Sequence, residues 1–125
     1  MPDFDVLGIG NALVDVVEQA DDAFLAEHYL KKGGKILVDS GQSDFLYSMM
    51  CSVTESSGGS CGNTMAGFVS LGGRGAYIGK VRDDDFGQVF RSDLEAIGVT
   101  FATPPAAGGP ATGRCLVLVT PDAQR

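Results

Sequence analysis

The chain has 125 residues, of which 44% are hydrophobic and 20% are charged, so it is a folded chain of about one domain rather than a disordered one. Its formal net charge is −7, and no run rich in Lys and Arg interrupts this acidic character. The charge therefore argues against nucleic acid and anionic membrane surfaces as partners.

The three cysteines show no paired spacing and no histidine cluster, which argues against both a disulfide framework and a zinc site. The first five residues are acidic where a secretory signal is basic, and the uncharged stretch at 56–73 is rich in Gly and Ser. These features predict a soluble, cytoplasmic protein.

The first part of the chain predicts two strands and two helices in alternation. Residues 4–10 form a short apolar run that ends in glycines, as a buried strand before a tight turn does. A helix is expected to begin at residues 21–22 and to stop before Gly33, with one face made of Phe24, Leu25, His28 and Tyr29. Residues 35–39 then predict a second strand, and residues 42–50 a second helix.

A glycine-rich segment at residues 58–64 predicts a loop that leads into the N-terminus of a helix, because apolar residues follow it at helical spacing. A strand is expected next, at residues 76–79. The aspartates at 83–85 then predict the start of a further helix, which carries an apolar stripe of Phe86, Val89, Phe90, Leu94 and Ile97 and is capped by Gly98.

Residues 115–119 form the last predicted strand. Strands and helices thus alternate through the middle of the chain. This alternation predicts an α/β fold with a parallel sheet covered by helices.

Asp15 is the first candidate binding residue. It follows a glycine-rich turn and stands among valines, so a carboxylate is presented from an otherwise apolar segment. Such an aspartate either satisfies the backbone donors of a turn or cap, or accepts hydrogen bonds from two adjacent hydroxyl groups of a sugar. The position alone leaves both interpretations open.

The segment from Gly58 to Asn63 also has two interpretations. It is either a tight turn with an N-cap, or a loop whose backbone N–H groups, with the Asn63 side-chain amide, bind a neutral polyol.

Two nucleotide-binding motifs are rejected. Residues 8–13 lack the third glycine of the dinucleotide fingerprint, and residues 58–64 lack the lysine of a P-loop.

Four motifs in register resemble the N-terminal part of the ribokinase-like (PfkB) sugar kinases, and most closely their adenosine kinase-like branch. They are GIGNALVD at 8–15, SGGSCGNT at 57–64, SLGG at 70–73 and IGKVRDDDFG at 78–87. The resemblance covers essentially the whole chain. It implies a ribokinase-like α/β fold, with a mostly parallel sheet flanked by helices and a small β-sheet lid.

The same resemblance implies a domain organisation and a substrate site. Residues 1–125 would be the N-terminal part of one kinase domain, with lid strands near 35–39 and 112–119, and without the C-terminal catalytic half. Asp15 would bind sugar hydroxyls, Gly59 and Asn63 would line the pocket, and Asn11 and Ser60 would lie beside it. No catalytic residue is expected in this chain, because the family's catalytic base belongs to the missing half.

Some positions differ from the usual family pattern. Cys61 stands where the family usually has a small residue, and Arg82 where it commonly has Gly. Ribose-specific members tend to have Lys at the place of Ser60, so the serine favours a nucleoside. Two other groups have simple explanations: His28 is interpreted as a packed or exposed histidine, and the aspartates at 83–85 as a helix N-terminus and not a metal cluster. Arg125 is a candidate phosphate-facing residue.

The implied function is ATP-dependent phosphorylation of a primary hydroxyl of a nucleoside or sugar, as in an adenosine kinase or a carbohydrate kinase. ATP with Mg²⁺ and a small-molecule substrate are the expected ligands, and the lid strands also offer a surface for a homodimer. Residues 1–125 alone are expected to be inactive. Two alternatives remain: a non-catalytic sugar or nucleoside binding module, and a structural dimerisation unit.

Overall fold

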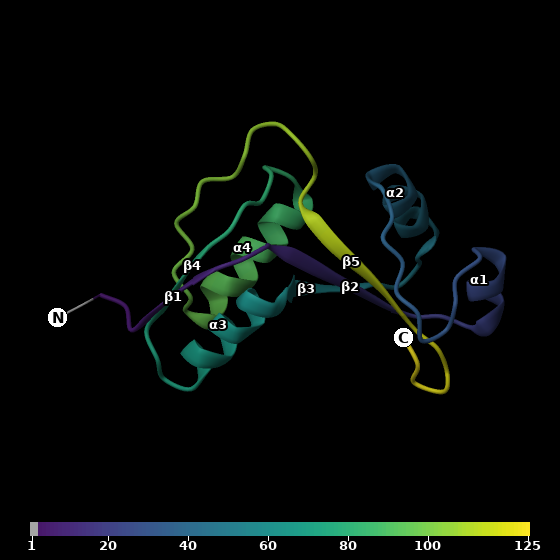
Figure 1. Ribbon diagram of the computed structural model, residues 1–125, viewed down its shortest axis with the longest axis horizontal. Coiled ribbons are helices and arrows are strands. Elements are labelled where there is room, and N and C mark those ends of the chain that lie inside the picture. The colour runs from purple at the N-terminus through teal and green to yellow at the C-terminus, as the bar shows by residue number, and fades with distance from the viewer. Residues whose placement is uncertain (1–2) are drawn as a thin grey trace. The chain divides into compact units, whose positions relative to one another are not determined.

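The computed structural model describes residues 3–125, and Figure 1 shows its alternating strands and helices. In the described part the elements are, in chain order, β1 (Val6–Ile9), β2 (Leu13–Gln19), α1 (Asp22–Glu27), α2 (Ser40–Met49), β3 (Thr54–Gly58), α3 (Ser60–Ser70), β4 (Gly75–Ile78), α4 (Asp85–Ile97) and β5 (Gly113–Val119). The predicted α/β class is confirmed.

The chain divides into two compact units. Unit 1 consists of residues 3–15 and 55–115, and unit 2 of residues 16–54 and 116–125. The described strands form two sheets, a parallel pair β1–β4 and a three-stranded sheet in the order β3-β2-β5. The prediction of a strand at residues 115–119 is confirmed, since these residues belong to β5.

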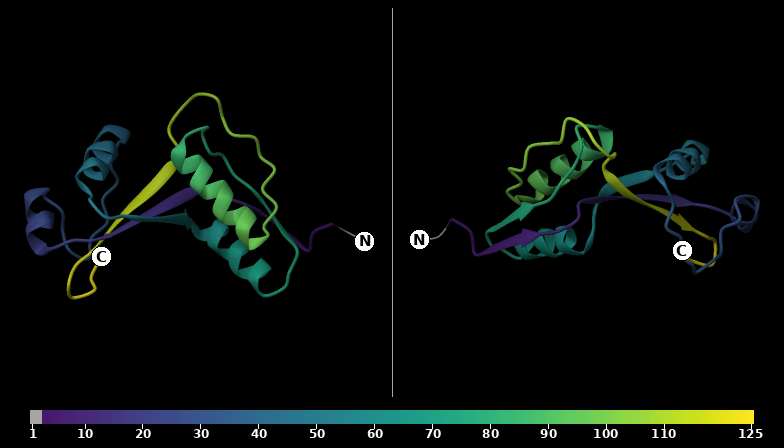
Figure 2. Two further views of the ribbon diagram at one scale, coloured as in Figure 1. Left: turned by 180° about the vertical axis from the view of Figure 1, so that it is seen from behind. Right: turned by 45° about the horizontal axis from the view of Figure 1, so that its top comes forward.

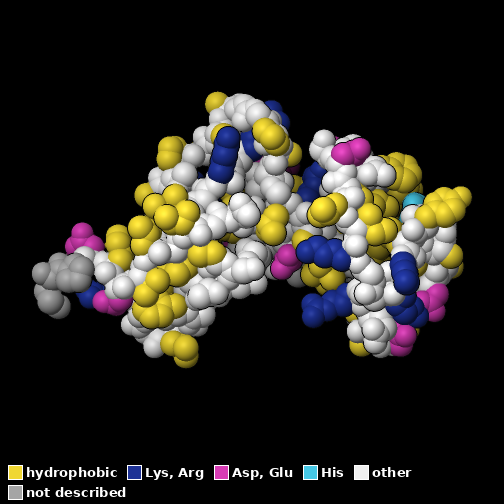
Figure 3. All heavy atoms as spheres, in the orientation of Figure 1, with side chains coloured by type: hydrophobic (Ala, Val, Ile, Leu, Met, Phe, Trp, Pro, Cys, Tyr) yellow, Lys and Arg dark blue, Asp and Glu magenta, His cyan; other side chains and the backbone are white. Residues whose placement is uncertain are grey.

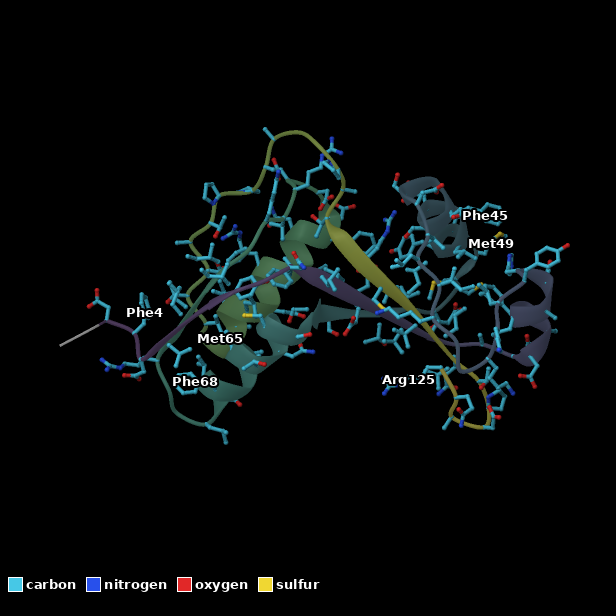
Figure 4. The ribbon with its side chains drawn as sticks, viewed as in Figure 1. Phe4, Phe45, Met49, Met65, Phe68 and Arg125 are labelled. Atoms are coloured by element: carbon cyan, nitrogen blue, oxygen red, sulfur yellow. The ribbon has the colours of Figure 1, made fainter. Side chains whose placement is uncertain are left out.

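The parallel pair in unit 1 packs closely against α3, because glycines in the strands leave room for its side chains. A Cβ atom built on Gly8 of β1 would lie 2.7 Å from Cγ of Met65, and one built on Gly75 of β4 would lie 2.5 Å from its Cε. Met65 is 1% exposed and is labelled on α3 in Figure 4. Both views of Figure 2 show α3 and α4 beside this strand pair.

Helix α4 buries its apolar stripe in the core of unit 1. Phe86, Phe90 and Leu94 are all buried, whereas Ile97, at the end of the predicted stripe, is exposed. The rings of Tyr77, Phe90 and Phe101 form one cluster, with centroids 5.4–5.6 Å apart. Burial, together with the nearby Cys61, raises the pKa of Tyr77 to about 12.

The ends of α4 follow the sequence prediction. Asp84 is the N-cap and accepts a hydrogen bond from the Gly87 amide at 2.8 Å, which confirms the aspartates at 83–85 as a helix start. Gly98 is the C-cap with φ of 103°, in the left-handed region that favours glycine.

The prediction of a buried strand at residues 4–10 is only partly correct. β1 forms within this run, but Leu7 is 55% exposed and Ile9 is 72% exposed. The two side chains lie on the opposite face of the strand from Gly8, and the described residues cover only the Gly8 face. Figure 3 shows hydrophobic side chains at the surface over this part of unit 1.

In unit 2, α1 is shorter than predicted. Asp21 caps it and accepts a hydrogen bond from the Phe24 amide at 2.8 Å, but the helix ends at Glu27 rather than just before Gly33. Tyr29 has φ of 56°, which no helix accommodates, and it is 92% exposed rather than part of the packed face. His28 remains in that face, with its ring centroid 4.4 Å from that of Phe24.

The predicted strand at residues 35–39 is wrong. These residues pair with no strand in the described part of the chain, and Leu37 is 92% exposed. A run of β-forming residues becomes a strand only where another strand satisfies its backbone, and none does so here. Asp39 instead begins α2, in a capping box with Gln42.

The segment at residues 58–64 is also more regular than the predicted loop. β3 ends at Gly58 and α3 begins at Ser60, so a single residue, Gly59, connects them. Its φ of 87° lets the chain turn directly from strand to helix. No helix among residues 3–125 combines the length and the hydropathy needed to cross a membrane.

Candidate functional site

Asp15 is the third residue of β2 and stands between two valines in the sequence. Val14 and Val16 are completely buried on the other face of the strand, and Asp15 is half-buried. The carboxylate accepts no hydrogen bond and forms no ion pair within residues 3–125. It is therefore neither a turn nor a cap aspartate, and its oxygens are available to an outside donor.

The Asp15 carboxylate lies directly against the backbone of Gly58, the last residue of β3. A Cβ atom built on Gly58 would lie 2.6 Å from Asp15 Cγ and from Oδ2, and 2.7 Å from Oδ1. Any side chain at this position would displace the carboxylate. Gly58 is thus the platform on which the carboxylate rests.

The neighbouring Gly59 fixes the turn that carries Asn11. A Cβ atom on Gly59 would lie 2.9 Å from the Asn11 carbonyl oxygen, and the positive φ of Gly59 independently favours glycine. Asn11 itself is exposed. The preceding residue, Gly10, donates its backbone N–H to the Ile78 carbonyl at 3.1 Å. The structure therefore brings Asn11, Asp15 and the two glycines together.

Ser60 and Asn63 lie in the first turn of α3. They are three residues apart in the helix, so they share one face, and both are exposed. The backbone N–H of Asn63 donates to the Gly59 carbonyl at 2.9 Å, and no side chain caps the helix at Gly59. The free N–H groups of this turn give the end of α3 a positive partial charge.

No three metal-ligating side chains come together among residues 3–125. Arg125 lies in unit 2 and is exposed (Figure 4).

The contacts that support this site have no local signature in the sequence. The glycine-rich pattern marks Gly58 as part of a loop, but not as the surface under Asp15. A second missed contact is a hydrogen bond from the Ser57 amide to Asp93 Oδ2, at 2.7 Å, which joins β3 to α4. Because these two residues are 36 positions apart, no local pattern could have indicated it.

Comparisons with known proteins all point to one family of kinases. The profile described as pfkB family carbohydrate kinase matches residues 49–125. A curated relative, adenosine kinase 2 of Arabidopsis thaliana, is 29% identical over 120 residues, which cover 91% of this chain and 34% of that protein.

Two solved structures are more similar. The adenosine kinase from Sinorhizobium meliloti has 48% identity and a TM-score of 0.84, over 98% of this chain and 38% of that one. The probable sugar kinase protein from Rhizobium etli CFN 42 has 42% identity and a TM-score of 0.85, over 100% of this chain and 38% of that one.

These likenesses bear out the ribokinase-like fold and the place near the adenosine kinases that the four motifs indicated. The chain spans little more than a third of the length of these relatives. With a profile match over more than half of its residues, it belongs to the pfkB family of carbohydrate kinases.

Proposed function

We propose that the complete polypeptide carrying these residues phosphorylates a primary hydroxyl of a nucleoside or sugar, and that this chain supplies the substrate-binding half of one kinase domain. ATP, accompanied by Mg²⁺, would supply the phosphoryl group, as family membership implies. In this proposal β5 contributes to the lid, and the catalytic base lies outside these residues.

The observation that carries the proposal is the Asp15 carboxylate, which rests on Gly58 without a partner in the described structure. Two carboxylate oxygens are well suited to accept hydrogen bonds from two adjacent hydroxyls, as on a ribose ring. Burying a carboxylate partly and leaving it unpaired is costly unless a ligand pairs with it. Asp15 would thus orient the sugar.

The other candidate residues extend the same binding site. Asn11 and Asn63 each offer an amide donor and an acceptor, and Ser60 offers a hydroxyl, so all three suit a neutral polyol. The N–H groups at the start of α3 would donate to ligand oxygens nearby. Phosphoryl transfer depends mainly on positioning and charge stabilisation, so holding the sugar in one orientation is the contribution expected of this half.

Adenosine is the proposed first substrate. The names of two relatives, from Sinorhizobium meliloti and Arabidopsis thaliana, support a nucleoside, while the relative from Rhizobium etli supports a sugar. Ser60 is neutral, and a sugar phosphate would call for Lys or Arg close to the binding residues. An unphosphorylated substrate therefore fits these residues better.

The test is release of ADP by the complete polypeptide with ATP and Mg²⁺, using adenosine, ribose and fructose 6-phosphate in parallel. We expect the highest kcat/KM with adenosine and no product from a polypeptide limited to residues 1–125. A preference for fructose 6-phosphate over both other substrates would contradict the proposed substrate class. Binding of adenosine without any turnover would identify a binding module instead of a kinase.

A further inference from the structure

Helix α4 contacts the chain on both sides of the single-residue connection between β3 and α3. On the strand side, the Asp93 carboxylate accepts the hydrogen bond from the Ser57 amide. On the helix side, the ring of Phe90 lies against Gly62, where a Cβ atom would be 3.7 Å from two ring carbons. Phe90 and Asp93 are three residues apart, so one face of α4 makes both contacts.

The hydrogen bond to Asp93 pairs one backbone donor on an edge of the sheet. Within the described residues β3 is an edge strand, paired only with β2, so the Ser57 amide has no strand partner on its outer side. At 2.7 Å and partly buried, a bond from an amide to a carboxylate is short and stronger than a bond between neutral groups. It fixes the end of β3 firmly to α4.

The residue next to Ser57 is Gly58, the platform under the Asp15 carboxylate, and Gly59 follows against the Asn11 carbonyl. A shift of β3 away from α4 would move both contacts together. The position of the proposed sugar-binding groups therefore depends on a carboxylate in α4 that is itself not among them.

We propose that Asp93 is a positioning residue: through the Ser57 amide it holds Gly58 and Gly59 in place, and so sets the position of Asp15 and Asn11. The inference rests on the proposed function for the identity of the ligand, but not for the mechanical link. Asp93 touches no reacting group in this account, and acts only through the backbone of β3.

The test compares three variants of the complete polypeptide. Asp93→Ala removes the acceptor, Asp93→Asn keeps an oxygen that can accept the Ser57 amide, and Glu95→Ala is the matched control. Glu95 is on the same helix and exposed, and within residues 3–125 its side chain makes only a 3.9 Å ion pair with Arg91.

For Asp93→Ala we expect KM for adenosine to rise by about fivefold or more, with a smaller change in kcat, because misplacing binding groups by a fraction of an ångström weakens substrate binding. Asp93→Asn should return KM to within about twofold of the wild type, as the rescue expected when one hydrogen-bond acceptor is replaced by another. A purely structural role would lower the melting temperature but leave KM unchanged. An unchanged KM in Asp93→Ala therefore overturns the inference.

The kinetics of Asp93→Glu and amide hydrogen exchange test the same link in two further ways. If Asp93→Ala does not fold, Asp93→Glu takes its place, since it keeps the charge but moves the carboxylate by one methylene, and the same KM criterion applies. If the wild type phosphorylates nothing, the proposed function fails, and amide hydrogen exchange at residues 58–60 decides the mechanical link. Faster exchange in Asp93→Ala than in Glu95→Ala supports it, and equal exchange overturns it.

Discussion

Two half-buried aspartates in unit 1, Asp15 and Asp84, have opposite surroundings. Asp84 accepts three hydrogen bonds, at 2.8 Å from the Gly87 amide, 2.6 Å from the Thr112 hydroxyl and 2.9 Å from the Thr112 amide. Asp15 accepts none from residues 3–125 and rests on bare glycine backbone. Asp84 thus connects two parts of the fold, whereas Asp15 is left unpaired within the described residues.

The comparison separates a structural carboxylate from a candidate binding one. Burial by itself raises the pKa of Asp84, but the hydrogen bonds from Thr112 and Gly87 outweigh it, so the pKa lies below its ordinary value. The folded protein thus supplies Asp84 with hydrogen-bond donors of its own. Asp15 accepts no hydrogen bond from the described residues, so its carboxylate oxygens are available to a ligand.

The largest expected effect is that of Asp15→Ala on catalysis. Each hydrogen bond between a charged group and a ligand hydroxyl is worth about 1.5–3 kcal/mol, so losing two should lower kcat/KM by about two orders of magnitude or more. The fold should be retained, because the Asp15 side chain makes no hydrogen bond or ion pair within the described structure. Steady-state kinetics of the complete polypeptide measure the first effect, and thermal unfolding the second.

Asp83→Ala is the matched control, since Asp83 is exposed and its side chain has no hydrogen-bond partner among residues 3–125. It should keep kcat/KM within about twofold of the wild type, as expected for a surface change. Unfolding of the Asp15→Ala variant, or kinetics like those of the control, would assign Asp15 to the structure instead of to ligand binding.

Gly58→Ala should have the next largest effect, because it displaces the Asp15 carboxylate without removing it. The new Cβ atom would lie 2.6 Å from the carboxylate, which must rotate away. We expect kcat/KM to fall by about tenfold, the scale on which small misplacements of binding groups act. Gly67→Ala is the control, because an added Cβ there meets no atom within 4 Å. Equal kinetics in the two variants would mean that the platform has no role.

Thr112→Val should have a smaller effect, on stability and not on substrate binding. The change keeps the shape of a side chain that is 4% exposed, but removes the hydroxyl that donates to Asp84 and accepts the Arg82 amide at 2.9 Å. We expect a loss of about 1–2 kcal/mol in the free energy of unfolding at pH 7, measured with urea. Full stability in this variant would contradict the structural role of Asp84.

The smallest expected effect is the pH dependence of that loss. The lowered pKa of Asp84 contributes stability that is present above the unfolded value, near 3.8, and is lost as the pH falls through the folded value. Thr112→Val removes one cause of the lowered pKa, so wild type and variant should become more alike below about pH 4. Urea unfolding from pH 7 to pH 3 would show this convergence, and a constant difference would contradict it.

The sequence predicted the elements whose signals are local. Helix α4 has its N-cap at Asp84, its C-cap at Gly98 and a buried stripe between them, all within one short segment. β2 and β3 were not predicted, because the apolar Leu13 and Val17 on the Asp15 face blur the alternation in β2, and Thr54–Gly58 contains no large apolar residue. Conversely, the apolar run at residues 35–39 predicted a strand that has no partner.

The candidate site divides in the same way. The types and order of Asn11, Asp15 and Gly59 are visible in the sequence, and the structure brings them together. The platform at Gly58 and its link to α4 through Asp93 depend on contacts between distant residues, which the sequence does not display. Local chemistry was therefore predictable, and the support that positions it was not.

The most direct test of the account is whether Asp15 and the ribose hydroxyls interact with each other. Calorimetry would give four dissociation constants, for adenosine and 2′,3′-dideoxyadenosine with the wild type and with Asp15→Ala. If the carboxylate binds the hydroxyls, removing them should weaken binding to the wild type by about tenfold or more, and binding to the variant by far less. If removing the hydroxyls weakened binding by the same factor in both proteins, the central claim would be contradicted.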